Sequence, residues 1–187
     1  MAAPSRLLLQ AAARVVRAGG LIAYPTEGVW GLGCEPQNAH ACERLLRLKQ
    51  RDPGKGLILI ASHFEQLISY LAPVPPDQLR IAQDSWPGPT TWLFPAGTGC
   101  PDWVRGAHPT VAVRVTAHPV AAALCTIYGG AMISTSANRS GRPPARSAMA
   151  LRRQMGPELD LIVSGALGGQ RGPSTIRHLQ DGRILRG

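Results

Sequence analysis

The sequence has few lysines and few aromatic residues, although it is strongly basic. Lys49 and Lys55 are its only lysines, and the other eighteen of its twenty basic residues are arginines. No apolar run approaches the ~18 residues of a membrane span, so no membrane association is expected. The four cysteines form no CxxC pair and lie at no zinc-ligand spacing from a histidine. Neither a structural metal site nor a disulfide framework is therefore indicated.

Standard motifs of nucleotide-binding and acyl-transfer enzymes are also missing. Gly28, Gly31 and Gly33 do not form GxGxxG, and the stretch around Lys55 lacks the serine or threonine and the upstream glycine of a Walker loop. The five histidines belong to no recognisable nucleophile motif. Any chemistry would rest on positioning and electrostatic stabilisation, which suits nucleotidyl transfer.

The totals indicate one globular domain that spans residues 1–187. Apolar residues make up 44% of the chain, which is long enough to bury a core without disulfides or metals. The net charge of +9 points to a polyanionic ligand such as a nucleotide or RNA. The plainer alternative is a basic, soluble surface.

The N-terminal segment carries arginines and no acidic residue before Glu27, as mitochondrial transit peptides do. Its apolar residues nevertheless fall on one helical stripe, formed by Leu7, Leu8, Ala11, Ala12, Val15 and Val16. Gly19-Gly20 would end this helix just before a strand. We therefore predict the first helix of the domain rather than a cleaved leader, and a cytoplasmic protein.

Predicted strands alternate with predicted helices along the chain. Strands are expected at residues 21–24, 57–61, 92–94, 111–115, 131–133, 161–164, 174–176 and 183–185. Helices are expected at residues 40–48 with Asn38 as cap, after Ser62 with Glu65 completing a capping box, and at 77–83, 119–128 and 147–155. The pattern predicts an α/β fold with an open, twisted, mixed sheet flanked by helices, whose polar loops gather along one edge into a ligand crevice.

Cations and hydroxyl groups occur where predicted strands and helices end. A glycine-rich loop follows the first strand, and the loop after residue 48 holds three cations within seven residues. The candidate phosphate-binding residues are Lys49, Arg51, Lys55, Ser136, Asn138 and Ser174, because such groups neutralise or orient phosphate oxygens. The alternative is that they are solvated loop cations and ordinary helix caps.

Two further side chains could contact a small polar molecule. Arg114 lies within an apolar strand, so it is either an edge arginine that reaches water or a buried fork that binds a carboxylate. Thr26 is a small hydroxyl beside glycine-rich backbone. Trp30 and Trp92 are expected in the core more than as base-stacking platforms.

Several motifs in order resemble the YrdC family, in particular its short, single-domain bacterial branch. Pro25-Thr26-Glu27 and the glycines that follow are similar to that family's proline-threonine-glutamate loop. Lys49-Gln50-Arg51 and Ser136-Ala137-Asn138 match its KxR and SxN signature. Further similar blocks begin at Trp86, Ala112 and Pro173, so the resemblance covers nearly the whole chain.

The resemblance implies an enzyme that joins L-threonine, bicarbonate and ATP into threonylcarbamoyl-adenylate and pyrophosphate. A partner complex would then transfer the threonylcarbamoyl group to adenosine 37, next to the anticodon of tRNA. The family's roles imply that Lys49, Arg51, Ser136, Asn138 and Ser174 hold the nucleotide phosphates. They also imply that Thr26 and Arg114 contact threonine. Mg²⁺ would accompany ATP without a set of protein ligands of its own. Binding of tRNA would be weak. The protein would be a monomer.

The sequence departs from the family pattern in the glycine-rich loop. Gly28 and Trp30 replace the threonine or alanine and the smaller aromatic residue that are usual there, and apolar Ile60 replaces the histidine of longer relatives. A non-catalytic RNA-binding protein, suggested by the charge, is the alternative. A carbamoyl-adenylate domain for hydrogenase maturation would share the fold but would come with zinc-finger and acylphosphatase segments.

Overall fold

A computed structural model describes residues 4–170 and 172–186. Its described residues form a nine-stranded sheet in the order β7-β1-β2-β6-β3-β5-β4-β8-β9. The strands are β1 (Ile22–Pro25), β2 (Trp30–Gly33), β3 (Ile58–Ala61), β4 (Thr90–Pro95), β5 (Thr110–Val115), β6 (Met132–Ser136), β7 (Leu161–Ile162), β8 (Thr175–His178) and β9 (Ile184–Arg186). The pairs β1-β7, β3-β5 and β4-β8 are parallel and the other pairs are antiparallel. The predicted mixed α/β sheet is confirmed.

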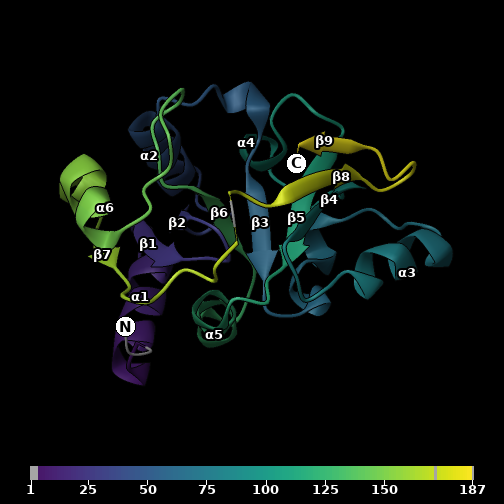
Figure 1. Cartoon of the computed structure of the whole chain (residues 1–187). Coiled ribbons are helices and arrows are strands. Elements are labelled where there is room, and N and C mark those ends of the chain that lie inside the picture. Colours follow the sequence, from purple (N-terminus) through teal and green to yellow (C-terminus); the bar gives the residue numbers. More distant parts are fainter. Residues whose placement is uncertain (1–3, 171, 187) are drawn as a thin grey trace.

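Helices cover the two faces of this sheet unequally (Figure 1). The helices are α1 (Arg6–Arg17), α2 (Ala39–Lys49), α3 (Pro76–Asp84), α4 (Asp102–Arg105), α5 (Pro119–Tyr128) and α6 (Ala148–Met155). Residues of α2, α3, α4 and α6 share one core with one face of the sheet. Helices α1 and α5 pack together and form a second core against only part of the other face.

Strand alternation explains which residues lie on the partly covered face. Ile60 of β3 is opposite Met132 of β6, and both belong to the core under α5. Two residues back along β3, Ile58 is opposite Ser134 and Ala112. Side chains two residues apart share a face, so these residues lie on the same face but beyond the cover of α5. A part of this face therefore remains open.

Most predicted elements occur close to the predicted bounds. Asn38 caps α2 by accepting from the Ala41 amide at 3.0 Å, and Ser147 caps α6 by accepting from the Ala150 amide at 3.1 Å. Trp30 and Trp92 are buried in the main core, as expected. Among the described residues, no helix is both long enough and apolar enough to cross a membrane.

Four local predictions were wrong. Residues 30–33, predicted as loop, form β2, because this stretch pairs with β1 across the short turn 26–29. The segment after Ser62 forms short 3-10 turns, because its hydroxyl bonds His63 and Gln66 instead of capping a helix. The loop 97–109 contains α4.

The fourth is the first residue of the apolar stripe of α1, because Leu7 is 76% exposed. The stripe is otherwise confirmed: Ala12 and Val16 are buried, and Leu8 and Val15 pack against the second core. Leu9 and Ala13, outside the predicted stripe, are also buried.

A strap formed by residues 163–170 and 172–174 lies between β7 and β8 and crosses the β1–β2 turn (Figure 1). The amides of Gly168 and Gln170 donate to the carbonyl oxygens of Thr26 and Glu27 at 3.0 and 2.9 Å. The approach is so close that a Cβ atom on Gly28 would lie 1.8 Å from the Gly172 carbonyl oxygen. This explains the glycine at position 28.

We predict that Gly28→Ala displaces the strap. Backbone must move to accommodate the added methyl group, so the free energy of unfolding should fall by about 1–3 kcal/mol. Urea denaturation measures this change, and hydrogen exchange should increase in the strap. Gly130→Ala is the control, because its Cβ would lie 3.5 Å from its nearest neighbour, the Tyr128 ring. Equal stability of the two variants would contradict this packing.

Candidate active site

A cavity of about 330 Å³ lies on the open part of the sheet face. Its floor is formed by residues that alternate along β2, β6, β3, β5, β4 and β8, among them Gly31, Ser134, Ile58, Ala112 and Leu93. Loops that follow β1, α2 and α4 complete the wall, together with the end of the strap. The prediction of a crevice along one sheet edge was therefore wrong in position, because α5 stops short and leaves a face open.

Five cations from four different segments meet at this cavity. They are Arg51, Lys55, Arg105, Arg114 and Arg186. Burial lowers the pKa of Arg51, while the neighbouring Asp52 acts in the opposite direction. Desolvation, followed by the charges of Arg51 and Arg114, lowers the pKa of Arg186, although its side chain is exposed at the cavity mouth. The cavity is therefore an anion site with a shared positive field.

Lys49 lies behind the cavity wall, where it joins the end of α2 to the turn after β6. It is 3% exposed, and its ammonium donates to the carbonyl oxygens of Ser136 and Asn138, the latter at 2.9 Å. The Asn138 side-chain oxygen lies 3.4 Å from the same nitrogen. Burial, followed by the charge of Arg51, lowers the pKa of Lys49 to about 7.

The SxN turn is ordered by its own side chains. The Ser136 hydroxyl donates to Asn138 Oδ1 at 2.6 Å, and Asn138 Nδ2 donates to the carbonyl oxygens of Arg139 and Arg142 at 3.1 and 2.7 Å. Ser136 lines the cavity, while Asn138 contacts it only through Ser136 and Lys49. Asn138 thus fixes the position of Ser136 in this structure.

Arg51 and Ser174 are held at the cavity wall by neighbouring groups. Arg51 donates through Nε and Nη2 to the Gly56 carbonyl oxygen at 3.2 and 3.0 Å. The Ser174 hydroxyl accepts from Thr91 at 2.9 Å, and Arg186 donates to the Ser174 carbonyl oxygen at 2.9 Å. These bonds bring the end of the strap and the edge strand β9 to the cavity.

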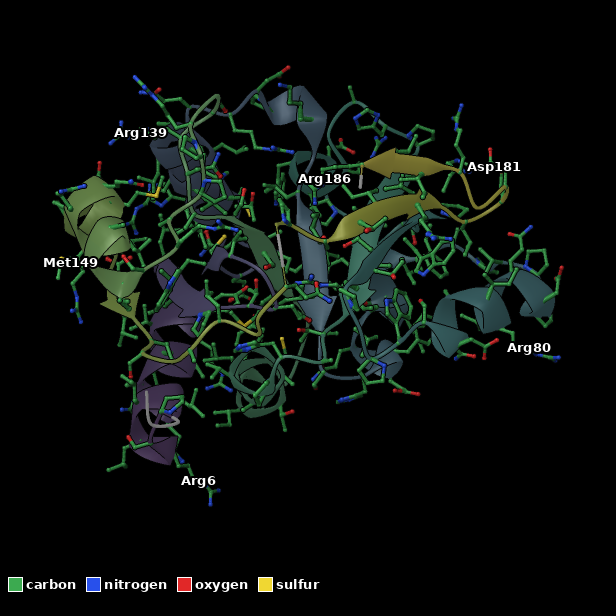
Figure 2. All side chains as sticks on the ribbon, in the orientation of Figure 1. Arg6, Arg80, Arg139, Met149, Asp181 and Arg186 are labelled. Carbon is green, nitrogen blue, oxygen red and sulfur yellow. The ribbon has the colours of Figure 1, made fainter. Side chains whose placement is uncertain are left out.

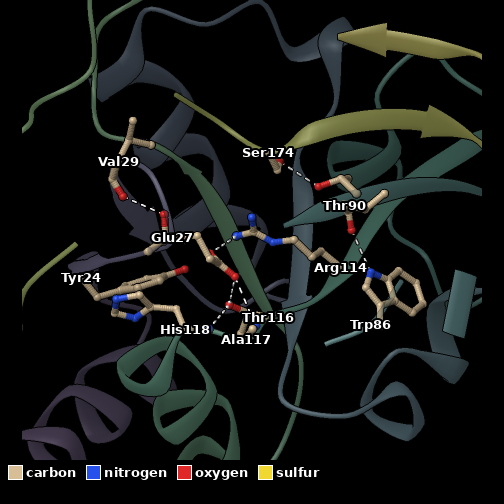
Figure 3. A network of polar contacts seen from close by, with 12 residues as sticks. Tyr24, Glu27, Val29, Trp86, Thr90, Arg114, Thr116, Ala117, His118 and Ser174 are labelled. Carbon is tan, nitrogen blue, oxygen red and sulfur yellow. Dashed lines mark hydrogen bonds and ion pairs between the residues drawn. The ribbon is translucent and has the colours of Figure 1, made fainter. Parts of the chain in front are cut away.

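Arg114 is a buried fork that faces a carboxylate, which decides between the two alternatives that the sequence left open. Its Nη2 lies 3.4 Å from Glu27 Oε2, and the two side chains are 7% and 9% exposed. Glu27 Oε1 accepts from the Thr116 hydroxyl at 2.7 Å and from the Ala117 amide at 3.2 Å (Figure 3). Both Arg114 and Glu27 line the cavity.

The structure brings most predicted site residues together. Thr26, Arg51, Lys55, Arg114, Ser136 and Ser174 line one cavity, and Lys49 and Asn138 bond to its wall. The Thr26 hydroxyl donates to the Val29 carbonyl oxygen at 2.7 Å, which orders the turn. Sequence reasoning missed Glu27, Thr116 and Arg186 as site residues. Glu27 lies inside the recognised motif and could have been found, whereas nothing in the sequence marks Arg186.

This arrangement can bind one large or two small anions on a preformed surface. Serine and threonine hydroxyls orient oxygen atoms without changing the charge. The fixed cations stabilise negative charge that develops during phosphoryl or nucleotidyl transfer.

Comparisons with known proteins find relatives over nearly the whole chain. The Sua5/YciO/YrdC family model, which carries the description "Telomere recombination", matches residues 14–187. A threonylcarbamoyl-AMP synthase of Halorhodospira halophila is 56% identical over 175 residues, which cover 94% of this chain and 92% of the relative. The corresponding enzyme of Pseudomonas aeruginosa is 52% identical over 177 residues, which cover 95% of this chain and 95% of the relative.

Two solved structures share the fold. P. abyssi Sua5 complexed with L-threonine superimposes with a TM-score of 0.89 at 32% identity, over 95% of this chain. The chain spans about half of that Sua5 chain, with 53% covered. E. coli YciO has a TM-score of 0.87 at 28% identity, over 98% of this chain and 90% of its own.

We predict a pH-dependent stability contribution from Lys49. Its pKa is about 7 in the folded chain, against an ordinary 10.5. Between these values the unfolded chain binds a proton that the folded chain does not, so folding becomes more favourable as pH rises. The unfolding free energy of the wild-type protein should therefore increase relative to that of Lys49→Met from pH 7 to pH 9, measured by urea denaturation.

Lys55→Met is the matched control, because Lys55 is exposed in the same loop. We expect its stability to stay within about 0.5 kcal/mol of the wild-type value. A constant difference between wild type and Lys49→Met across this pH range would contradict the lowered pKa.

Proposed function

The chain belongs to the Sua5/YciO/YrdC family, and from this premise we propose that it acts as a threonylcarbamoyl-AMP synthase. It joins L-threonine, bicarbonate and ATP into threonylcarbamoyl-AMP and pyrophosphate. The threonine amine takes up the carbon of bicarbonate with loss of water, which gives a carbamate. A carbamate oxygen then attacks the α-phosphorus of ATP, and pyrophosphate leaves.

The observation that carries this proposal is one cavity in which separate strands and loops supply fixed cations and hydroxyls. ATP is a polyanion, and both threonine and its carbamate carry carboxylate groups. The transfer needs alignment of these anions and protection of the carbamate from water. A largely preformed cavity on a sheet face supplies both.

The nucleotide lies along the cationic side of the cavity in this proposal. Arg51, Lys55, Ser136 and Ser174 contact the phosphates directly. Lys49 and Asn138 support the turn that carries Ser136, and a phosphate that reached Lys49 would favour its charged form. Arg51 and Lys49 are the residues on which catalysis depends most, because Arg51 faces the phosphates and Lys49 orders the turn that carries Ser136.

Threonine lies beside the β1–β2 turn in this proposal. Its carboxylate pairs with the Arg114 guanidinium, and Thr26 contacts the small side chain or the amine. The L-threonine complex of P. abyssi Sua5, a structural relative, supports a threonine site in this fold. The apolar Ile60 belongs to the core under α5 and does not line the cavity, so threonine is held from the Thr26 side.

Mg²⁺ would arrive with ATP and remain on phosphate oxygens and water. Residues 4–170 and 172–186 contain no group of three or more histidine, cysteine, aspartate or glutamate side chains that could hold a metal ion. The donor set of the cavity is cationic, and it fits the phosphates rather than the metal. The ion would supply charge neutralisation on the triphosphate.

The product is a labile adenylate, so a transfer complex must consume it on tRNA. We propose that the protein works as a cytoplasmic monomer, where ATP and tRNA are available, with only weak tRNA contact of its own. A non-catalytic RNA-binding protein is disfavoured, because full-length relatives at more than half identity carry the synthase name. Steep salt dependence of tRNA binding without substrate turnover would instead favour it.

We expect pyrophosphate release from ATP only when threonine and bicarbonate are both present. Arg51→Ala and Lys49→Ala should lower this rate by about 100-fold or more, because the first removes a cation that stabilises developing charge and the second removes the support of the turn that carries Ser136. A coupled pyrophosphate assay, with mass-spectrometric detection of the adenylate, measures the effect.

Arg80→Ala is the matched control. Arg80 is exposed on α3, at the outer end of the molecule and remote from Arg186 at the cavity (Figure 2). Its rate should equal that of the wild-type protein. Pyrophosphate release that ignores threonine would contradict the proposed function.

A further inference from the structure

The Glu27–Arg114 pair differs from every other ion pair among the described residues. Its side chains are 7% and 9% exposed, whereas each of the other pairs has side chains between 25% and 82% exposed. A buried ion pair is a poor source of stability, because desolvation offsets much of the attraction. The pair therefore calls for an explanation other than stability.

Neighbouring groups bond to the Glu27 carboxylate oxygen that does not contact the Arg114 guanidinium. The Thr116 hydroxyl and the Ala117 amide occupy Oε1, and the Thr116 oxygen in turn accepts from the His118 amide at 3.2 Å. The segment between β5 and α5 thus anchors the carboxylate. The other carboxylate oxygen, Oε2, pairs with the Arg114 guanidinium.

Glu27 contacts Arg114 but does not occupy all of its hydrogen-bond donors. The contact at Nη2 is 3.4 Å, and neither Arg114 Nε nor Glu27 Oε2 has a hydrogen-bond partner, although both atoms are buried. A guanidinium has five donors, so donors on Arg114 remain for a ligand in the cavity. Strand β5 directs the side chain to the cavity face, and Glu27 limits where its planar end can lie (Figure 3).

Glu27 also makes the positive charge of the cavity uneven. Arg51 and Arg186 have no carboxylate within ion-pair distance among the described residues, whereas Arg114 has one. A free Arg114 would be attracted to a triphosphate as strongly as its neighbours are. Pairing with Glu27 weakens that attraction and leaves a fork of fixed orientation, which suits a carboxylate with one negative charge.

We infer that Glu27 is a positioning residue, which holds the Arg114 guanidinium toward the carboxylate of threonine and away from the nucleotide phosphates. This inference rests on the proposed function. Glu27 does not touch the substrate in this account. It acts through Arg114, and the Thr116 hydroxyl acts through Glu27.

The test uses Glu27→Gln, Thr116→Val and Thr116→Ser in the full chain. Glu27→Gln keeps the shape and removes the charge, so KM for threonine should rise by about tenfold or more, as expected for loss of a charged hydrogen-bonding partner. KM for ATP should change less than about twofold, because Arg51 and Arg186 keep their contacts. Thr116→Val removes the hydroxyl and should raise KM for threonine by a smaller factor, whereas Thr116→Ser should restore it.

A merely structural role would change both KM values together and lower the melting temperature. Glu158→Gln is the control, since it breaks an exposed ion pair with Arg139, and both KM values should stay unchanged. The inference is overturned if Glu27→Gln leaves KM for threonine unchanged, if it raises both KM values equally, or if Thr116→Ser behaves as Thr116→Val does.

Calorimetric titration with threonine alone separates this inference from the proposed function. Weaker threonine binding by Glu27→Gln would support the role of Glu27 even if the wild-type protein released no pyrophosphate. The missing pyrophosphate release would then overturn only the synthase activity. Equal threonine binding by wild type and Glu27→Gln would overturn the inference while pyrophosphate release still supported the activity.

Discussion

Backbone carbonyl oxygens hold the cations of the cavity wall. Lys49 donates to the carbonyls of Ser136 and Asn138, Arg51 to that of Gly56, and Arg186 to that of Ser174. A carbonyl dipole orients a cation without cancelling its charge. Like charges can therefore be kept close together before an anion arrives, and no reorganisation is needed when it binds.

This constraint explains why so many segments meet at one place. Each carbonyl belongs to a turn or a strand end, so the bond that orients the cation also holds that backbone in place. The turn after β6 is completed by Lys49 from the end of α2, and the end of the strap is completed by Arg186 from β9. Packing of the sheet is thereby linked directly to the geometry of the anion site.

Arg105 and Arg114 are the two cavity cations that pair with a carboxylate, and the pair of Arg114 is the buried one. This buried pair gives the cavity two different environments. One part has cations that backbone carbonyls orient without a neutralising carboxylate, which suits phosphates. The other has a cation balanced by Glu27, which favours a singly charged group. An enzyme that must bind ATP and an amino acid in adjacent positions needs this difference, because uniform positive charge would let phosphate occupy both.

Local patterns in the sequence were sufficient for much of the fold. Alternation in residues 111–115 identified β5 and the face on which Arg114 lies, and Asn38 and Ser147 marked the starts of two helices. Those features depend on neighbours within a few residues. The stripe of α1 was predicted correctly at Ala12 and Val16 but not at Leu7, because the tertiary contact with α5 decides which apolar residues are buried.

The sequence by itself determined the chemical groups of the site and their order along the chain, since cations, hydroxyls and glycines must be encoded where strands and helices end. Only the tertiary structure decided that Arg186, which is 135 residues from Arg51, lines the same cavity, and that Glu27 pairs with Arg114. The physical reason is strand order. Pairing across the sheet brings distant segments together, and the length of α5 leaves one part of a face open for them.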